Sequence, residues 1–338
     1  MTRSGPEAAV ETGPEARGAR LLVIVPCLDE ERTVGQVVAG LPRSLPGIAE
    51  LEVLVIDDGS SDATAQRARE AGASVLRHAV NLGLGETFRR GVREALARGA
   101  DILVNIDGDG QFDPASTSEL IAPIVRGEAH MVTASRFLDP ALTPRMPAIK
   151  RWGNRQVARI VRLLTGKRFH DVSCGFRAFS REALLRMNLY GSFTYTHETF
   201  MDLVFKGMTI REIPLPVRGT REFGQSRIAS SIPRYAWRSL QIMLRAFISY
   251  QPFKFFSAVA LFFFAVSAAL LGFLGWHFLS SGTFSPHIWA GFVGGSFGFV
   301  GLVTLVMGLL GDMLVRMRRN QEEILSMLRR AEGSRVDP

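Results

Sequence analysis

The segment ILVNIDGDGQFDP, residues 102–114, decides how the fold of this chain is interpreted. It begins as an apolar, β-branched run that is typical of a buried strand, and this run stops at Asp107. Asp109 and Gln111 follow at alternate positions, so their oxygens and those of Asp107 can converge on one divalent cation such as Mg²⁺. A solvated acidic loop is the simpler interpretation, because Asp-x-Asp pairs are common in loops.

A second acidic strand end lies upstream and favours a ligand site. Residues 53–58 read VLVIDD, so Asp57 and Asp58 stand where this strand stops. In open α/β sheets, ligands bind outside the carboxyl ends of the strands. Two strands that both end in carboxylates therefore predict a metal–nucleotide site at that edge rather than a solvated loop.

The spacing of the apolar runs predicts an α/β fold with a mostly parallel sheet. Alternating strands and helices form βαβ units. Strands are expected at residues 21–26, 51–57, 74–77 and 102–106, and helices at about 31–41, 61–71 and after the glycine-rich turn 81–85. Farther on the alternation is lost, with strands expected at 131–136, 176–179 and 209–213 and a helix at 151–165. No G-x-G-x-x-G follows the first strand, which argues against a dinucleotide-dependent oxidoreductase.

The charge and hydropathy of the chain indicate a membrane protein. Its 338 residues carry a formal net charge of +8, which suggests nucleic acid or an anionic membrane surface as a partner. Residues 255–311 contain no Asp, Glu, Lys or Arg, and they hold two apolar runs, 255–279 and 288–311, each long enough to span a bilayer. A buried pair of core helices is the alternative. Run length and the absence of charge favour a transmembrane hairpin, so no nucleic-acid partner is expected.

Basic residues on both sides of the hairpin predict its orientation. Arg245 and Lys254 precede the first run, Arg316, Arg318 and Arg319 follow the second, and the loop between them has no Lys or Arg. Cytoplasmic flanks carry the excess of basic residues. We therefore expect a multi-pass protein of the cell (inner) membrane, with the domain before the hairpin and both termini in the cytoplasm.

Two further segments have the composition of helices that meet a membrane. Arg151, Arg155, Arg159 and Arg162 are spaced four, four and three residues apart, so they share one face of a helix. This face could bind anionic lipid headgroups or a lipid phosphate. An RNA-binding or merely solvated face is the alternative, and the membrane spans favour lipid. Residues 232–250 mix arginine with aromatic residues, which is typical of an interfacial helix.

Six short motifs occur in an order that resembles a known family. They are residues 26–30 (PCLDE), 56–60 (IDDGS), 81–85 (NLGLG), 107–111 (DGDGQ), 135–136 (SR) and 171–177 (DVSCGFR). Together they resemble family 2 glycosyltransferases of the GT-A fold, and above all the dolichyl- or polyprenyl-phosphate hexose synthases of the mannose and glucose types. The resemblance covers about residues 20–228. The chain departs from the family pattern at Asp29, where Asn is usual, and at Leu28, where an aromatic residue is frequent.

The resemblance implies a role for each motif. Asp107, Asp109 and Gln111 would hold Mg²⁺ or Mn²⁺ and organise the diphosphate, and Asp57 would face the nucleoside. The rest of the implied nucleotide-sugar site comprises Pro26, Leu28, Glu30, Asp58 and Gly85, with Arg221 and Arg227 as a mobile basic clamp. The implied acceptor site comprises Arg136, Lys150, Arg151, Arg155 and Ser173. The implied catalytic set is Asp109, Asp171, Glu198 and Arg136.

The expected reaction follows from these parts. A hexose passes with inversion from a nucleotide-diphosphate sugar, GDP-mannose or UDP-glucose, to polyprenyl phosphate. The phosphate nucleophile is already ionised near neutral pH, so a strong general base is not required. Asp171 and Glu198 are the candidates if a base exists, and either could equally position an arginine or support the fold. A homo-oligomer is compatible with the sequence.

Two other classes of protein remain open at this point. A processive polysaccharide synthase would share the first half of the chain, but its Gln-x-x-Arg-Trp motif is absent, and two spans are few for a polymer channel. A non-catalytic membrane scaffold on a degenerate transferase fold is disfavoured by the intact Asp107, Asp109 and Gln111 set. The expected organisation is a disordered tail at 1–19, a GT-A domain at 20–230, an interfacial helix at 231–252, a transmembrane hairpin at 253–312 and a basic cytosolic tail at 313–338.

Overall fold

The computed structural model describes residues 18–144, 146, 148–189, 195–218, 237, 240–241, 244–245 and 247–334. The chain divides into two compact units, residues 1–239 with 328–338 and residues 240–327. Most of the expected N-terminal tail, half of the expected interfacial helix, Arg221 and Arg227 lie outside the described residues. The side chain of Lys150 does so too.

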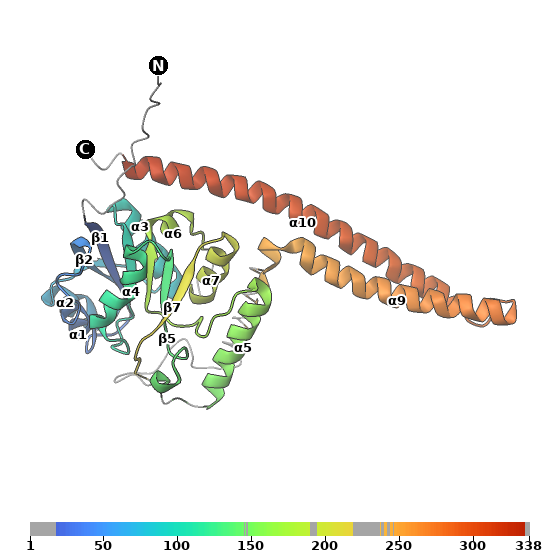
Figure 1. The fold of residues 1–338 in the computed structure, drawn as a ribbon, viewed down its shortest axis with the longest axis horizontal. Coiled ribbons are helices and arrows are strands. Elements are labelled where there is room, and N and C mark those ends of the chain that lie inside the picture. The colour runs from blue at the N-terminus through green and yellow to red at the C-terminus, as the bar shows by residue number, and fades with distance from the viewer. Residues whose placement is uncertain are drawn as a thin grey trace, which may run out of the picture. The chain divides into compact units, whose positions relative to one another are not determined.

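The first unit is built on a mixed sheet of seven strands (Figure 1). The strand order is β3-β2-β1-β4-β6-β5-β7, and β6 runs antiparallel to both of its neighbours, β4 and β5. The strands are β1 (Ala19–Cys27), β2 (Ile48–Asp57), β3 (Ser74–Arg77), β4 (Ile102–Asn105), β5 (Met131–Ser135), β6 (Arg177–Ser180) and β7 (Ile210–Pro214). The prediction of an α/β fold with a mostly parallel sheet is confirmed.

Seven helices accompany these strands within the described part of the first unit. They are α1 (Val34–Ala39), α2 (Thr64–Glu70), α3 (Leu84–Ala97), α4 (Thr117–Val125), α5 (Ala148–Thr165), α6 (Arg181–Arg186) and α7 (Thr196–Phe205). Helices α4, α6 and α7 were not expected from the sequence. Helix α4 contains Pro123, and α6 has only six residues, so neither shows the long apolar period by which a helix is recognised.

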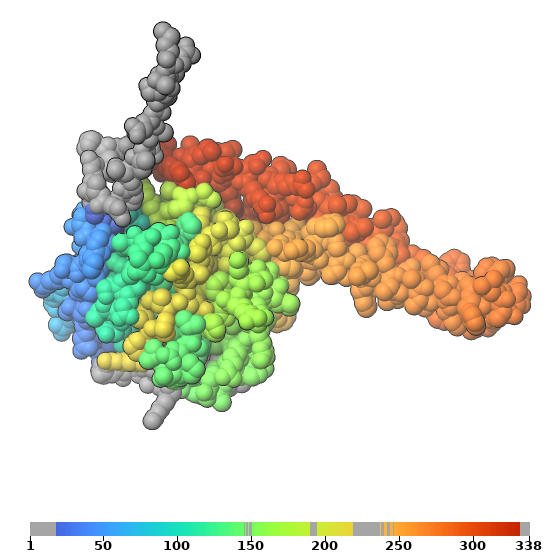
Figure 2. Space-filling view, in the orientation of Figure 1, coloured from blue at the N-terminus to red at the C-terminus, as the bar shows by residue number. Residues whose placement is uncertain are grey.

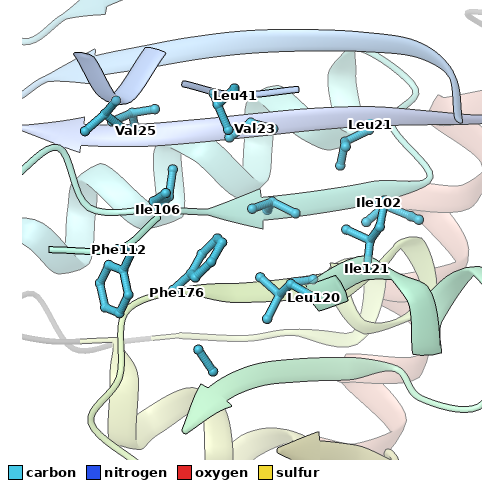
Figure 3. Packing of buried hydrophobic residues seen from close by; sticks show 14 of the residues in the cluster. Leu21, Val23, Val25, Leu41, Ile102, Ile106, Phe112, Leu120, Ile121 and Phe176 are labelled. Atoms are coloured by element: carbon cyan, nitrogen blue, oxygen red, sulfur yellow. The ribbon is translucent and has the colours of Figure 1, made fainter. Parts of the chain in front are cut away.

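Alternate residues of the central strands pack on opposite faces of the sheet, because successive strand side chains point in opposite directions. On one face, Leu21, Val23 and Val25 of β1 join buried side chains of α1, α2 and α4. Figure 3 shows part of this cluster, including Leu120 and Ile121 of α4. Helix α3 packs across β1, β2 and β4. This buried core fixes the positions at which the strands end, and the candidate site lies at those ends.

The second unit contains the two apolar helices. Helix α9 (Pro252–Ser281) ends at Gly282 in the left-handed conformation, and α10 (Ile288–Ser334) follows. Each helix has an 18-residue window apolar enough to cross a membrane by length and composition, and only 11% and 17% of these windows is buried. Glycine lets the two helices approach closely, since a Cβ on Gly301 would lie 2.9 Å from the Phe264 ring. The predicted pair of apolar helices is present, and α10 continues past residue 312 through Ser334.

Candidate active site

Carboxylates from three strand ends surround the Cys27 thiol. Cys27 and Asp57 are the last residues of β1 and β2 and lie opposite each other in the sheet. Burial raises the pKa of the Cys27 thiol well above its usual value, and the negative charges of Glu30, Asp57, Asp107 and Asp109 raise it further. All four carboxylates are therefore close enough to the Cys27 thiol to raise its pKa. Residues that are up to 79 positions apart in the sequence meet at one edge of the sheet, as their strand-end positions predicted.

The loops after β1 and β2 are bonded to each other. The backbone N–H of Asp29 donates to Ser60 Oγ at 2.9 Å, and the N–H of Ser61 donates to Asp29 Oδ1 at 2.7 Å. The N–H of Glu30 donates to Thr64 Oγ1 at 2.8 Å. Asp29 has a φ of +52°, a left-handed conformation that Asn and Asp tolerate better than other side chains. Aspartate can therefore take the place of the usual asparagine. Its carboxylate accepts a hydrogen bond from the loop after β2 and does not cap helix α1.

The neighbouring carboxylates Asp57 and Asp58 have different surroundings. Asp57 is fully buried, and its Oδ1 accepts a hydrogen bond from the Ser60 N–H at 2.9 Å. Its Oδ2 lies 3.1 Å from Arg77 Nε but accepts no hydrogen bond from the described residues. Such an atom is well placed to accept a bond from a ligand, because a buried oxygen without a donor is costly.

Asp58 holds the glycine-rich turn that precedes α3. Its Oδ1 lies 2.8 Å from His78 Nδ1 and accepts from the Leu82 N–H at 2.9 Å, while its Oδ2 accepts from the Gly83 N–H at 2.8 Å. Gly85 lies in the first turn of α3. Asp58 thus positions this turn, and its predicted contact with a nucleotide stays a prediction.

The loop after β4 presents the predicted metal ligands. Asp109 is 3% exposed, and its Oδ1 accepts from the Gln111 N–H at 3.0 Å. Gln111 is bonded to the segment after β7, since its Nε2 donates to the Arg218 carbonyl at 3.2 Å. Asp107 lies against Gly175, where a Cβ would approach Oδ2 to 2.4 Å, so only glycine leaves room for this carboxylate.

This donor set fits a hard divalent cation. Two carboxylates and an amide oxygen are the ligands that Mg²⁺ and Mn²⁺ prefer. Within the part of the chain that the structure describes, no three His, Cys, Asp or Glu side chains are grouped to hold a metal by themselves. A cation bound at Asp107 and Asp109 would therefore take its other ligands from Gln111, water or the diphosphate of a bound nucleotide.

Arg136, which is partly exposed, forms a two-point ion pair with the fully buried Asp171. Arg136 Nε donates to Asp171 Oδ2 at 2.6 Å, and Arg136 Nη2 donates to Asp171 Oδ1 at 2.8 Å and to Ser173 Oγ at 2.6 Å. Ser173 in turn lies 3.2 Å from Asn154 of α5. Burial alone would raise the pKa of the Asp171 carboxyl, but the charge and hydrogen bonds of Arg136 outweigh burial and hold that pKa below its usual value. Asp171 is therefore ionised and orients Arg136.

A fully buried arginine, Arg177, supports the wall of the site. Its guanidinium donates to the carbonyls of Val172 at 2.9 Å, Cys174 at 2.8 Å and Thr196 at 2.8 Å, and it lies 4.8 Å from the centre of the Phe200 ring. Sequence reasoning saw Arg177 only as the end of the 171–177 motif. The available signal was an arginine inside the apolar strand sequence FRAF, where a surface residue would be out of place.

The remaining predicted residues lie on three other elements. Glu198 is in the first turn of α7 and is partly buried. Arg151 and Arg155 are exposed on α5. Pro26 and Leu28 flank Cys27 at the end of β1, where Pro26 lies opposite Ile56 of β2. The structure thus brings Glu30, Asp57, Asp107 and Asp109 together and places the arginines of α5 on a separate, exposed helix.

A mixed sheet of this order, with carboxylates at three strand ends, fits the GT-A fold that the motifs predicted. The chain belongs to glycosyl transferase family 2, which matches residues 22–187. It is 31% identical over 210 residues to an uncharacterized protein of Methanocaldococcus jannaschii, covering 61% of this chain and 84% of that protein. It is 28% identical to the polyprenol monophosphomannose synthase of Mycolicibacterium smegmatis, covering 64% and 84%.

The fold is shared with a solved enzyme. Glucosyl-3-phosphoglycerate synthase from Mycobacterium tuberculosis, in complex with Mn²⁺, uridine diphosphate and glucosyl-3-phosphoglycerate, superposes with a TM-score of 0.55. The sequences are 23% identical, and the match covers 73% of this chain and 86% of the other. The GT-A fold and the glycosyltransferase class predicted from the motifs are confirmed.

Proposed function

We propose that this protein transfers a hexose with inversion from a nucleotide-diphosphate sugar, GDP-mannose or UDP-glucose, to polyprenyl phosphate, with Mg²⁺ or Mn²⁺ as cofactor. The observation that carries the proposal is the convergence of Glu30, Asp57, Asp107 and Asp109 on Cys27 at the strand ends. Such a concentration of negative charge suits a cation that bridges protein and diphosphate. The polyprenol phosphate chemistry in the name of the M. smegmatis relative supports the acceptor.

The donor half of the site follows from the acidic edge. The buried Asp57 Oδ2 would accept a hydrogen bond from a base N–H or a ribose hydroxyl of the nucleoside, with Pro26, Leu28, Asp58 and Gly85 shaping the surroundings. Asp107, Asp109 and Gln111 would hold the metal. When bound, the metal would offset the negative charge that develops on the leaving diphosphate. Arg221 and Arg227 remain the predicted clamp over that diphosphate.

The acceptor half centres on Arg136. Asp171 accepts two hydrogen bonds from the Arg136 guanidinium and so fixes its position. Arg136 would therefore lose little conformational entropy when it binds a lipid phosphate. Because Arg136 keeps the pKa of Asp171 low, Asp171 is a weak base. The ionised lipid phosphate needs none, and Asp171 is assigned as the residue that positions Arg136. Ser173, Lys150, Arg151 and Arg155 would complete the acceptor site, and Glu198 is the remaining candidate for a base.

Helices α9 and α10 would anchor the enzyme where its lipid acceptor resides. We assign them as two membrane spans of the cell (inner) membrane, with the glycosyltransferase domain and both termini cytoplasmic. The basic flanks of the apolar windows support this orientation. Residues 231–252 would form an amphipathic helix that lies in the membrane interface.

A donor and acceptor panel tests the proposal. The full-length protein in nanodiscs is incubated with radiolabelled GDP-mannose, UDP-glucose and UDP-N-acetylglucosamine, with and without polyprenyl phosphate and EDTA. We expect one labelled polyprenyl-phosphate sugar that forms only with acceptor and free metal, and none from the Asp109→Asn control. A labelled polymer would indicate a polysaccharide synthase instead. No nucleotide binding and no product with any donor would indicate a non-catalytic scaffold.

A further inference from the structure

A basic cavity lies beside α5, away from the acidic strand ends. Its volume is ≈ 520 Å³, compared with ≈ 440 Å³ for the cavity beside Gln111. We call it the α5 pocket. Its walls include Phe137 and five arginines, Arg151, Arg155, Arg159, Arg162 and Arg168. Arg168 comes from the loop after α5, so the structure adds a fifth guanidinium to the four whose helical spacing the sequence displayed.

The charges of the α5 pocket are not neutralised within the described residues. None of its five arginines forms an ion pair there, and Arg159 Nη1 bonds only the uncharged amide of Gln156, at 3.3 Å. Some exposed arginines elsewhere in the same unit are paired, for example Arg20 with Glu50 and Arg126 with Glu128. Five like charges around one cavity repel each other, and an anion that enters the cavity would relieve this repulsion.

Exposed apolar side chains share the helix face with these arginines. Trp152 is 59% exposed and Leu163 is 83% exposed. Trp152 and Leu163 are eleven residues apart, which is close to three full turns of an α-helix. Arg159 is seven residues after Trp152, close to two turns, so the three side chains point in nearly the same direction. Helix α5 lies at the surface of its unit (Figure 2). A soluble anion would gain nothing from Trp152 and Leu163, whereas tryptophan and leucine beside basic residues suit the headgroup region of a bilayer.

We propose that the α5 pocket binds the phosphate of an anionic membrane phospholipid and docks the glycosyltransferase domain on the bilayer. Arg159, Arg162 and Arg168 hold the headgroup phosphate, while Trp152 and Leu163 enter the boundary between headgroups and acyl chains. The pocket adjoins the acceptor site centred on Arg136, since the Arg136 guanidinium lies 5.4 Å from the centre of the Phe137 ring and Arg151 and Arg155 line the pocket wall. The headgroup site proposed here is the part of the pocket formed by Arg159, Arg162 and Arg168. It does not depend on which sugar or acceptor the enzyme uses.

A fluorescent probe at position 163 tests this docking directly. Cys27 and Cys174 are the only cysteines and both are buried, so a Leu163→Cys variant of the full chain can be labelled selectively with bimane. The labelled protein is placed in nanodiscs of phosphatidylcholine alone or with one third phosphatidylglycerol, each containing a brominated lipid that quenches bimane on contact. We expect strong quenching only with phosphatidylglycerol, and less quenching at high salt, because salt screens exposed charges.

Charge-removal variants make the test specific. Arg159→Gln, Arg162→Gln and Arg168→Gln together should reduce the docked-to-undocked ratio by on the order of a hundredfold, since each arginine near an anionic surface is worth about fivefold. The matched control is Arg43→Gln, Arg67→Gln and Arg69→Gln, which removes the same charge from exposed positions far along the chain. This control should quench like the parent. The thermal melting of both triple variants shows whether they are folded.

Three results would overturn the proposal. Equal quenching in both lipid mixtures would mean that apolar contact alone docks α5. Quenching restored in phosphatidylcholine by a small fraction of polyprenyl phosphate, but not by phosphatidylglycerol, would assign the pocket to the acceptor. Loss of quenching on addition of millimolar inorganic phosphate in phosphatidylglycerol nanodiscs at constant ionic strength would indicate a site for a soluble phosphate.

Discussion

The acidic edge of the sheet and the basic face of α5 are built in opposite ways. Asp57 is fully buried and Asp109 is 3% exposed, and the oxygens of both accept backbone hydrogen bonds. The arginines of α5 are exposed and unpaired among the described residues. Buried, bonded groups are held in one geometry, as catalysis requires, whereas exposed charges attract a partner over a distance without fixing its position. This difference suits the roles proposed for the two regions, which are catalysis at the acidic edge and membrane attachment at α5.

The largest effect should come from the acidic edge. Asp109→Asn removes one ligand charge at the proposed metal site while its shape is kept. Turnover should fall by about 10²–10³, as is typical when one electrostatic contact to the transition state is lost. The melting temperature should change little. Initial rates across a Mn²⁺ titration measure this, and near-wild-type turnover at saturating Mn²⁺ would reject Asp109 as a ligand.

A smaller effect on the reaction is expected at Arg151, which lies on the basic face of α5 and is assigned to the acceptor site. Arg151→Ala removes one charged contact proposed for the acceptor phosphate, so the KM for polyprenyl phosphate should rise by about tenfold. Donor binding, measured by calorimetry without acceptor, should stay unchanged. The opposite pattern, weaker donor binding with an unchanged acceptor KM, would move Arg151 to the donor side. Arg43→Ala removes one charge at an exposed position outside both sites, and this control should leave both values nearly unchanged.

A fully buried histidine of α7, His197, should contribute to the response of stability to acid. Burial and the nearby Arg177 charge lower the pKa of His197 to about 4, against 6.5 for an ordinary histidine. Between pH 4 and pH 6.5 the unfolded chain therefore binds more protons than the folded chain. The free energy of unfolding falls as the pH drops from about 6.5 to 4. Asp171 acts lower, because its stabilisation is lost only below the ordinary aspartate pKa of 3.8.

Melting temperatures of the wild type and of His197→Gln between pH 7 and pH 4.5 check this assignment. The variant should be less stable at pH 7 and should lose less stability on acidification. Equal pH dependence in the two proteins would show that another group is responsible.

The smallest effect is expected in the hairpin. Its apolar runs hold no ionisable side chain except His277, near the turn between α9 and α10, and transport paths normally need polar groups within the membrane. Replacement of residues 255–311 by an unrelated uncharged two-span hairpin should therefore leave turnover of a long-chain acceptor within about twofold. Anchored protein with strongly reduced turnover would mean that the native spans contact the lipid specifically.

Local patterns in the sequence were sufficient for the strands and for the acidic half of the site. A strand of alternating or continuous apolar residues that ends in a carboxylate identifies both the element and the edge where its side chain lies. For this reason Asp57, Asp107 and Asp109 could be placed together before their contacts were known. Helices α4, α6 and α7 could not be predicted, because short helices stabilised by packing carry little periodicity of their own.

By itself the sequence determined the α/β class, the two apolar helices, the acidic strand ends and the basic face of α5, because each depends on the period or composition of one continuous segment. Only the tertiary structure decided that Arg136 is paired with Asp171, that Asp58 holds the turn before α3, and that Arg177 is buried and bonded to the loop that precedes β6. These contacts join residues from different elements. Which partner a charged side chain takes depends on burial and on the geometry of the packed sheet, and no local pattern contains that information.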